Sequence, residues 1–228
     1  MREGTALLIG QAGLDEDALA APSALPGWTR AHVLAHVAAN ADALGRLIHW
    51  AATGEPTPMY ASLQERAAGI ERGSRLPAAD LTAWLHGSAE ALEQAMTALG
   101  EEQWQARVVT AQGRTVPATE VPWMRSREVC VHAVDLATGL SFAGLPPAFL
   151  AALCDDVTAK RAAGPGPALV LAATDTGGRW ELPGDAPADG SPVTLAGSLA
   201  EVTAYLTGRP HQLTTAGGGA PPVLPPWL

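Results

Sequence analysis

The stretch SALPGWTRAHVLAHVAANADALGRLIHWAATGEP, residues 23–56, decides the fold of this chain. Within this stretch Pro-Gly-Trp-Thr is a helix start signal, and Gly54 with Pro56 is a stop signal. The residues between these signals are predicted to form one long helix. The apolar stripe of this helix consists of Val33, Val37 and Leu44. A long helix with one apolar stripe must bury that stripe against other elements, and helices are the simplest partners.

Three other segments repeat apolar residues at helical spacing. They lie near residues 3–20, 77–99 and 119–138. With the first helix they form an up-down pattern of four helices, with one long connection around residues 54–76. A strand-like piece at 104–122 leads into the last of these helices. The pattern predicts an up-down four-helix bundle.

The texture of the sequence changes at GPGP, residues 164–167. A helix near residues 146–162 is followed by strand, turn, strand, strand and helix signals that end at Gly208. We therefore expect an α+β chain: a four-helix bundle over residues 1–145 and a small α/β domain over residues 146–228.

Composition excludes several function classes. The chain has 228 residues and a net charge of −9 without a Lys/Arg cluster, which argues against nucleic-acid binding. No apolar run approaches the ~20 residues of a membrane span, and no cleavable leader is evident. Two cysteines, Cys130 and Cys154, do not make a disulfide framework, so we expect a cytoplasmic protein. Its expected partners are small molecules, and the chain is expected to be a monomer or homodimer.

Histidines on the long helix differ in direction. On a helical wheel, His36 and Asn40 lie at the edge of the apolar stripe and face inward. His32 is rotated toward the polar side, and His49 lies on the outer face. His36 is therefore the best inward-facing ligand of this helix, with His32 as the alternative.

The segment RSREVCVHAVDL, residues 125–136, supplies a second set of polar groups. Glu128 and His132 are four residues apart, and with Asp135 they share one helix face. Two histidines and one carboxylate form a metal site that leaves coordination positions open. The alternative is a buried His–Glu hydrogen-bonded pair without a metal, and spacing alone does not separate the two.

Several motifs resemble the mycothiol-dependent maleylpyruvate isomerase family, which belongs to the DinB-like metal-binding four-helix bundles. In chain order they are LPGWTRAHVLAHVAANADAL (25–44), Arg66 with Ile70 and Glu71, REVCVHAVDLATG (127–139), SLAEVTAYLTGR (198–209) and the terminal LPPWL (224–228). The resemblance covers nearly the whole chain. It implies a metal, usually zinc, held by His36, Glu128 and His132, and a sterol-carrier-like C-terminal domain.

The resemblance also implies chemistry. Mycothiol would be the thiol cosubstrate, and a zinc ion lowers the pKa of a thiol that binds to it. Addition of the thiol to the double bond of maleylpyruvate, rotation and elimination would give fumarylpyruvate. Two alternatives stay open: a mycothiol S-transferase that conjugates another electrophile, and a non-catalytic small-molecule binding protein with an apolar groove in residues 165–213.

Four further residues have expected roles. The substrate carries carboxylates, so a cationic clamp is needed, and Arg209 and Arg66 are the candidates. Asn40 lies one turn from His36 and is expected to orient a ligand or bond the thiol. Asp135 is expected to support His132 from behind the site.

Overall fold

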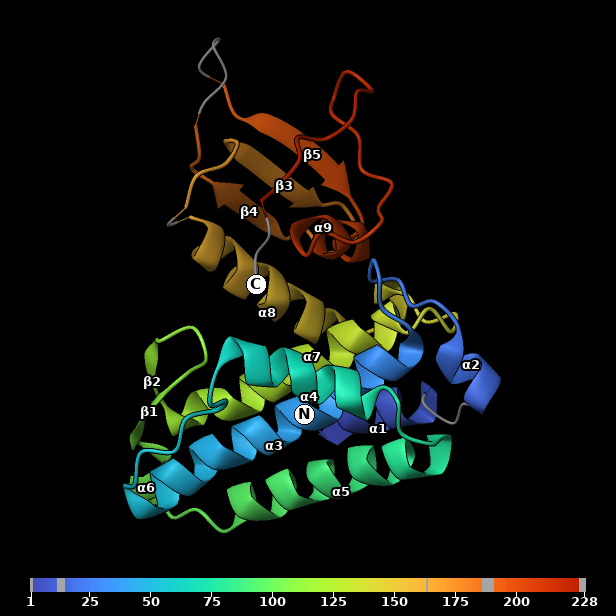
Figure 1. Cartoon of the computed structure of the whole chain (residues 1–228). Helices are drawn as coiled ribbons and strands as arrows, with labels where there is room; N and C mark the ends of the chain where they lie inside the picture. Colours follow the sequence, from blue (N-terminus) through green and yellow to red (C-terminus); the bar gives the residue numbers. More distant parts are fainter. Residues whose placement is uncertain (1, 12–14, 163, 186–190, 226–228) are drawn as a thin grey trace. The chain divides into compact units, whose positions relative to one another are not determined.

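The computed structural model divides the chain into two units, Met1–Gly139 and Leu140–Leu228 (Figure 1). It describes residues 2–11, 15–162, 164–185 and 191–225. Pro226, Trp227 and Leu228, which complete the LPPWL motif, lie outside the described residues. The division falls a few residues before the expected boundary at 145, because the short helix η2 (Phe142–Gly144) packs against a helix of the second unit.

Helices make up most of the first unit, as the sequence predicts. Its bundle consists of α1 (Arg2–Gln11), α3 (Arg30–Thr53), α5 (Ala78–Thr97) and α7 (Val121–Asp135). The central helix α3 packs against both α5 and α7, and α1 packs against α7. A buried apolar cluster, including Leu44, Leu47 and Leu92, fills the space between them. Among the described residues, no helix is both long and apolar enough to cross a membrane.

Local signals in the sequence set the ends of α3. Thr29 is its N-cap, and the Thr29 hydroxyl accepts a hydrogen bond from the backbone N–H of His32. At the other end Gly54 has a left-handed backbone with φ of 77°, which glycine adopts without steric cost. These caps hold α3 at its full length of 24 residues. The predicted long helix is thus confirmed.

The single helix expected near residues 3–20 is wrong, and the long connection at 54–76 contains an element that the sequence analysis did not identify. The segment 3–20 forms two helices, α1 and α2 (Glu16–Ala20), and Asp15 caps the second one; residues 12–14 between them lie outside the described part. The connection 54–76 contains a further helix, α4 (Leu63–Gly73). Ser62 caps it by accepting from the N–H of Glu65, a Ser-x-x-Glu start signal that reveals this helix in the sequence.

Helix α4 lies close against α3 (Figure 1). Gly73 makes this approach possible, since a Cβ atom there would lie 2.6 Å from the ring of Trp84 and 2.9 Å from the Cβ of Ala35. The close packing matters for function because α4 carries Arg66 on the side of α3.

A small hairpin follows the bundle helix α5. The elements are α6 (Glu101–Trp104), β1 (Arg107–Val109), β2 (Thr115–Pro117) and η1 (Ala118–Glu120). The two strands pair antiparallel, and Val108 and Val116 are buried in the same cluster as α3. The strand-like piece expected before the last bundle helix is confirmed.

The second unit is a three-stranded sheet with two helices. Its elements are α8 (Pro147–Arg161), β3 (Leu169–Ala173), β4 (Arg179–Leu182), β5 (Val193–Gly197) and α9 (Leu199–Leu206). β3 is central, antiparallel to β4 and parallel to β5. Both helices pack against each other and against the sheet (Figure 1). The α+β expectation for the whole chain is confirmed.

Candidate metal centre

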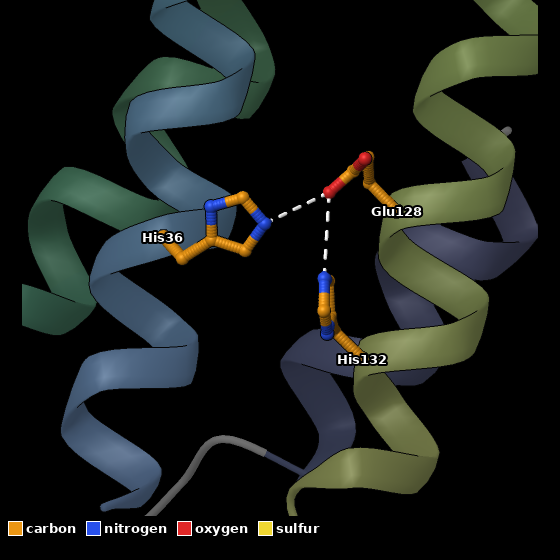
Figure 2. Close-up of side chains that lie close together, drawn as sticks. All are labelled: His36, Glu128 and His132. Atoms are coloured by element: carbon orange, nitrogen blue, oxygen red, sulfur yellow. Dashed lines mark hydrogen bonds and ion pairs between the residues drawn. The ribbon is translucent and has the colours of Figure 1, made fainter. Parts of the chain in front are cut away.

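Three side chains from two helices converge inside the bundle (Figure 2). His36 comes from α3, and Glu128 and His132 come from successive turns of α7. The Oε2 atom of Glu128 lies 3.0 Å from Nε2 of His36 and 3.4 Å from Nε2 of His132. One donor atom of each residue lies within 4.8 Å of the other two. We call these three residues the triplet.

A buried carboxylate supports the triplet from behind. Asp135 is fully buried, and its Oδ2 lies 2.9 Å from Nδ1 of His132. This contact favours a hydrogen on Nδ1, so the lone pair of a neutral His132 ring is on Nε2, which faces Glu128. A carboxylate behind a ligating histidine is a recurrent feature of metal sites, and here it fits a cation at the triplet.

Electrostatic interactions couple the three groups. Burial disfavours the charged form of His132, but hydrogen bonds and charge from Asp135 and Glu128 outweigh it and raise the His132 pKa to about 9. Burial also acts on Glu128, but hydrogen bonds from both histidines hold its pKa well below the usual range. Burial lowers the pKa of His36, which keeps this ring neutral, as a metal ligand must be.

Arg66 contacts the far side of His36. Its Nη2 lies 3.3 Å from Nδ1 of His36. A guanidinium only donates, so Nδ1 accepts and the Nε2 hydrogen points to Glu128. A cation bound at Nε2 requires the hydrogen on Nδ1 instead, and Nδ1 then no longer accepts from Arg66. Arg66 and the triplet are therefore linked through a single imidazole ring.

Aromatic and polar neighbours hold the rings of His36 and His32 on α3. The Trp28 ring lies edge-on to His36, with 5.7 Å between ring centroids. His32 takes no part in the triplet: its Nδ1 lies 2.7 Å from the Thr29 hydroxyl and its Nε2 lies 3.2 Å from Glu71. The wheel placed His32 toward the polar side, and the structure gives it a capping role.

Sequence reasoning missed a buried arginine beside the triplet. Arg125 lies on α7 one turn before Glu128 and is 1% exposed. Its Nη1 donates to the carbonyl of Val37 at 2.7 Å and to Oδ1 of Asn40 at 3.1 Å, while Nη2 finds no hydrogen-bond partner among the residues that the structure describes. Arg125 thus links α7 to α3 by hydrogen bonds. The side-chain Oδ1 of Asn40 accepts one of them, although Asn40 was expected to bond a ligand. The signal in the sequence is an arginine three residues before Glu128, on the same helix face.

A tyrosine near Arg66 was also missed. The guanidinium of Arg66 lies 5.8 Å from the centre of the Tyr60 ring. Burial raises the pKa of the Tyr60 phenol despite the nearby positive charge of Arg66, so the hydroxyl stays protonated. Tyr60 lies in the connection before α4, where no periodic pattern marks a site residue.

Arg209 lies in the second unit, directly after α9 and Gly208. Its Nη1 donates to the carbonyl of Thr207 at 2.6 Å, and its backbone N–H donates to the carbonyl of Ala204 at 2.8 Å. These contacts define its local backbone turn. Its expected role toward the substrate stays a prediction.

Comparisons with known proteins agree with this geometry. The family model described as "Mycothiol maleylpyruvate isomerase N-terminal domain" matches residues 2–137. A crystal structure of a mycothiol-dependent maleylpyruvate isomerase is 40% identical, with a TM-score of 0.90, and the match covers 98% of this chain and 92% of that one. The structure of a histidine-to-alanine mutant of a mycothiol-dependent maleylpyruvate isomerase matches at 39% identity, with the same TM-score and coverage. None of the curated proteins matches the chain. The chain belongs to the mycothiol maleylpyruvate isomerase family.

Proposed function

We propose that this protein is a mycothiol-dependent, metal-assisted cis–trans isomerase of maleylpyruvate-type substrates. The observation that carries this proposal is the triplet: two imidazole nitrogens and one carboxylate oxygen that converge in the bundle of a family member. The two solved relatives are isomerases of this kind by name, and both cover nearly the whole chain.

His36, Glu128 and His132 are the proposed ligands of one divalent metal ion, with zinc as the proposed ion. Two histidines and one carboxylate suit zinc and leave positions open for another ligand. When bound, such an ion would supply Lewis acidity and lower the pKa of a thiol at an open position. Asp135 holds His132 in the tautomer that ligation needs, and the lowered pKa of His36 keeps that ring neutral.

The proposed reaction is addition of the thiol to the substrate followed by its elimination, and the remaining site residues are proposed to bind the substrate or the thiol. In the isomerisation, the activated double bond of the substrate accepts the thiol sulfur and becomes a single bond. It then rotates, and loss of the thiol restores the double bond in the trans form. Arg66 and Arg209 are the proposed groups for the substrate or the thiol, since guanidinium groups bind carboxylates with charge-assisted hydrogen bonds. We propose that Asn40 contributes indirectly, through its bond with Arg125.

The compartment is also proposed. Cys130 and Cys154 are buried free thiols with pKa values that burial raises to about 11, so neither is an activated nucleophile. Unpaired cysteines fit a reducing compartment, and we propose the cytoplasm.

Elemental analysis and a coupled assay test the proposal. The purified protein is expected to contain one divalent metal per chain and to convert maleylpyruvate to fumarylpyruvate only when mycothiol is present. Removal of the metal with a chelator should abolish turnover, and added zinc should restore it. A stable thiol conjugate of the substrate, without isomer, would identify a transferase instead. Full activity in metal-free protein would refute the metal-assisted mechanism.

A further inference from the structure

A cavity of about 230 Å³ lies within the first unit. Residues of α3, of the connection after it and of α4 line the cavity. Those that carry the argument are Asp42, Arg46, Tyr60, Glu65 and Arg66. Arg66 connects the cavity with the metal centre, because it lines the cavity and also contacts Nδ1 of His36.

The cavity holds two positive charges without carboxylate partners. In the part of the chain that the structure describes, neither Arg66 nor Arg46 forms an ion pair. Of the two lining carboxylates, Glu65 pairs with Arg72 at 2.7 Å, whereas Asp42 accepts from the neutral indole N–H of Trp84 at 2.8 Å and keeps its negative charge. The two guanidinium charges of Arg46 and Arg66 exceed the one uncompensated carboxylate charge of Asp42, so the net charge in the cavity is positive, which favours an anion.

Tyr60 holds the positive charge of Arg66 in place. Its ring lies under the guanidinium of Arg66, a cation–π arrangement that restricts the long side chain. Its phenol is largely buried, and burial raises its pKa, so the hydroxyl remains available as a hydrogen-bond donor. The cavity therefore combines two guanidinium groups with a neutral hydroxyl, a set suited to a carboxylate.

The size of the cavity selects among anions. Pockets for drug-sized ligands run from about 300 Å³ upward, so a cavity of about 230 Å³ suits a small molecule. A short dicarboxylate is small enough, and one carboxylate held by Arg66 lies next to the His36 ring.

We propose that this cavity is the subsite for one carboxylate of the substrate, with Arg46 and Tyr60 as its specificity-determining residues beside Arg66. This inference rests on the proposed function and adds to it the place where the substrate is held.

Binding of succinate to the metal-loaded protein tests the subsite. Succinate is a short dicarboxylate without a double bond, so no thiol reaction interferes. Isothermal titration calorimetry at low ionic strength compares wild type with Arg46→Gln and Tyr60→Phe. We expect each substitution to weaken succinate binding by roughly three- to tenfold, as for partly exposed charge-assisted contacts.

A matched variant controls for loss of charge. Arg107→Gln removes one positive charge from an exposed hairpin position that does not line the cavity. This variant should bind succinate as wild type does. In turnover assays, Arg46→Gln should raise the KM for the dicarboxylate substrate by a similar factor and leave the KM for mycothiol unchanged.

Three results would overturn the subsite: no succinate binding by wild type, equal affinity in wild type and Arg46→Gln, or a raised KM for mycothiol alone in that variant. The last result would assign the cavity to the thiol. Failure of the proposed function is distinct, because it means that wild type does not isomerise the substrate whatever its affinity for succinate.

Discussion

One oxygen atom, Oε2 of Glu128, faces the Nε2 atoms of both His36 and His132. Each histidine has a further polar neighbour on its Nδ1 atom, Arg66 for His36 and Asp135 for His132. The two rings are therefore not equivalent. The Asp135 contact favours the His132 tautomer with its hydrogen on Nδ1, which leaves Nε2 for a metal. His36 must instead lose the hydrogen bond that its Nδ1 accepts from Arg66 before its Nε2 can bind a metal.

Substitution of His132 should remove the metal. His132→Ala deletes one of three proposed ligands, so the variant should retain little zinc by elemental analysis. His32→Ala is the matched control, because the His32 ring bonds Thr29 and Glu71 and lies outside the triplet. It should keep one metal per chain. Full zinc in His132→Ala would disprove the ligand assignment.

The metal-free protein should lose stability as pH rises. A His132 pKa raised to about 9 means that the folded protein holds this proton more tightly than the unfolded chain, where the pKa is about 6.5. The resulting stabilisation is complete below pH 6.5 and disappears as pH rises through about 9. We expect the Tm in excess chelator to fall over this window.

Asp135→Asn is the control for the pH effect, since it removes the main hydrogen-bonding carboxylate behind His132. Its Tm should depend less on pH over the same window. The lowered pKa of Glu128 acts separately, because its stabilisation is present above about pH 4.5 and is lost only at lower pH. A constant wild-type Tm between pH 6.5 and 9 would contradict the assigned His132–Asp135 coupling.

Contacts between helices set the spacing of the site. Arg125 on α7 donates to the carbonyl of Val37 and to Asn40 on α3, so one side chain links the two helices that carry the triplet. Helix α4 brings Arg66 to the outer side of α3 through the close approach at Gly73. The Arg125 hydrogen bonds and the close packing at Gly73 both set the positions of the groups around His36.

Gly73→Ala should push α4 away from α3. The new Cβ would lie 2.6 Å from the Trp84 ring, and such overpacking costs about 1–3 kcal/mol of unfolding free energy. Because α4 carries Arg66, the KM for the substrate should also rise. Gly87→Ala on α5 is the control, since no atom lies within 4 Å of its Cβ position, and it should be neutral or slightly stabilising. Denaturant unfolding and steady-state kinetics measure both effects, and equal stability of the two variants would contradict the packing argument.

The chain divides into two compact units, and the triplet lies wholly in the first. The second unit is therefore not needed to supply metal ligands. Its proposed contribution is Arg209, at the end of α9, as a group for the substrate.

Arg209→Ala should separate substrate binding from metal binding. A charge-assisted hydrogen bond contributes about 1.5–3 kcal/mol, so kcat/KM should fall roughly ten- to a hundredfold. Metal content and Tm should stay close to wild type, because Arg209 is not a proposed ligand and its guanidinium donates to the carbonyl of Thr207, two residues away. Unchanged kinetics would make Arg209 a structural residue of its own unit.

Local patterns in the sequence determined the long helices and the faces of their polar residues. The caps of α3 are the residues that directly precede and follow the helix in the sequence. Glu128 and His132 share a face because helical geometry places residues four apart on one side. The same wheel argument pointed His36 inward and His32 outward. The helix α4 was missed although Ser62 and Glu65 mark its start, because its short apolar pattern is weak.

Only the tertiary structure decided which groups meet. His36 and Glu128 are separated by 92 residues, and no local pattern fixes their contact. The same holds for Arg125 with Asn40 and for the cavity formed by Arg46, Tyr60 and Arg66. Such contacts depend on how α3, α4 and α7 pack, and packing is set by the shapes of many buried side chains together, not by the spacing along one segment.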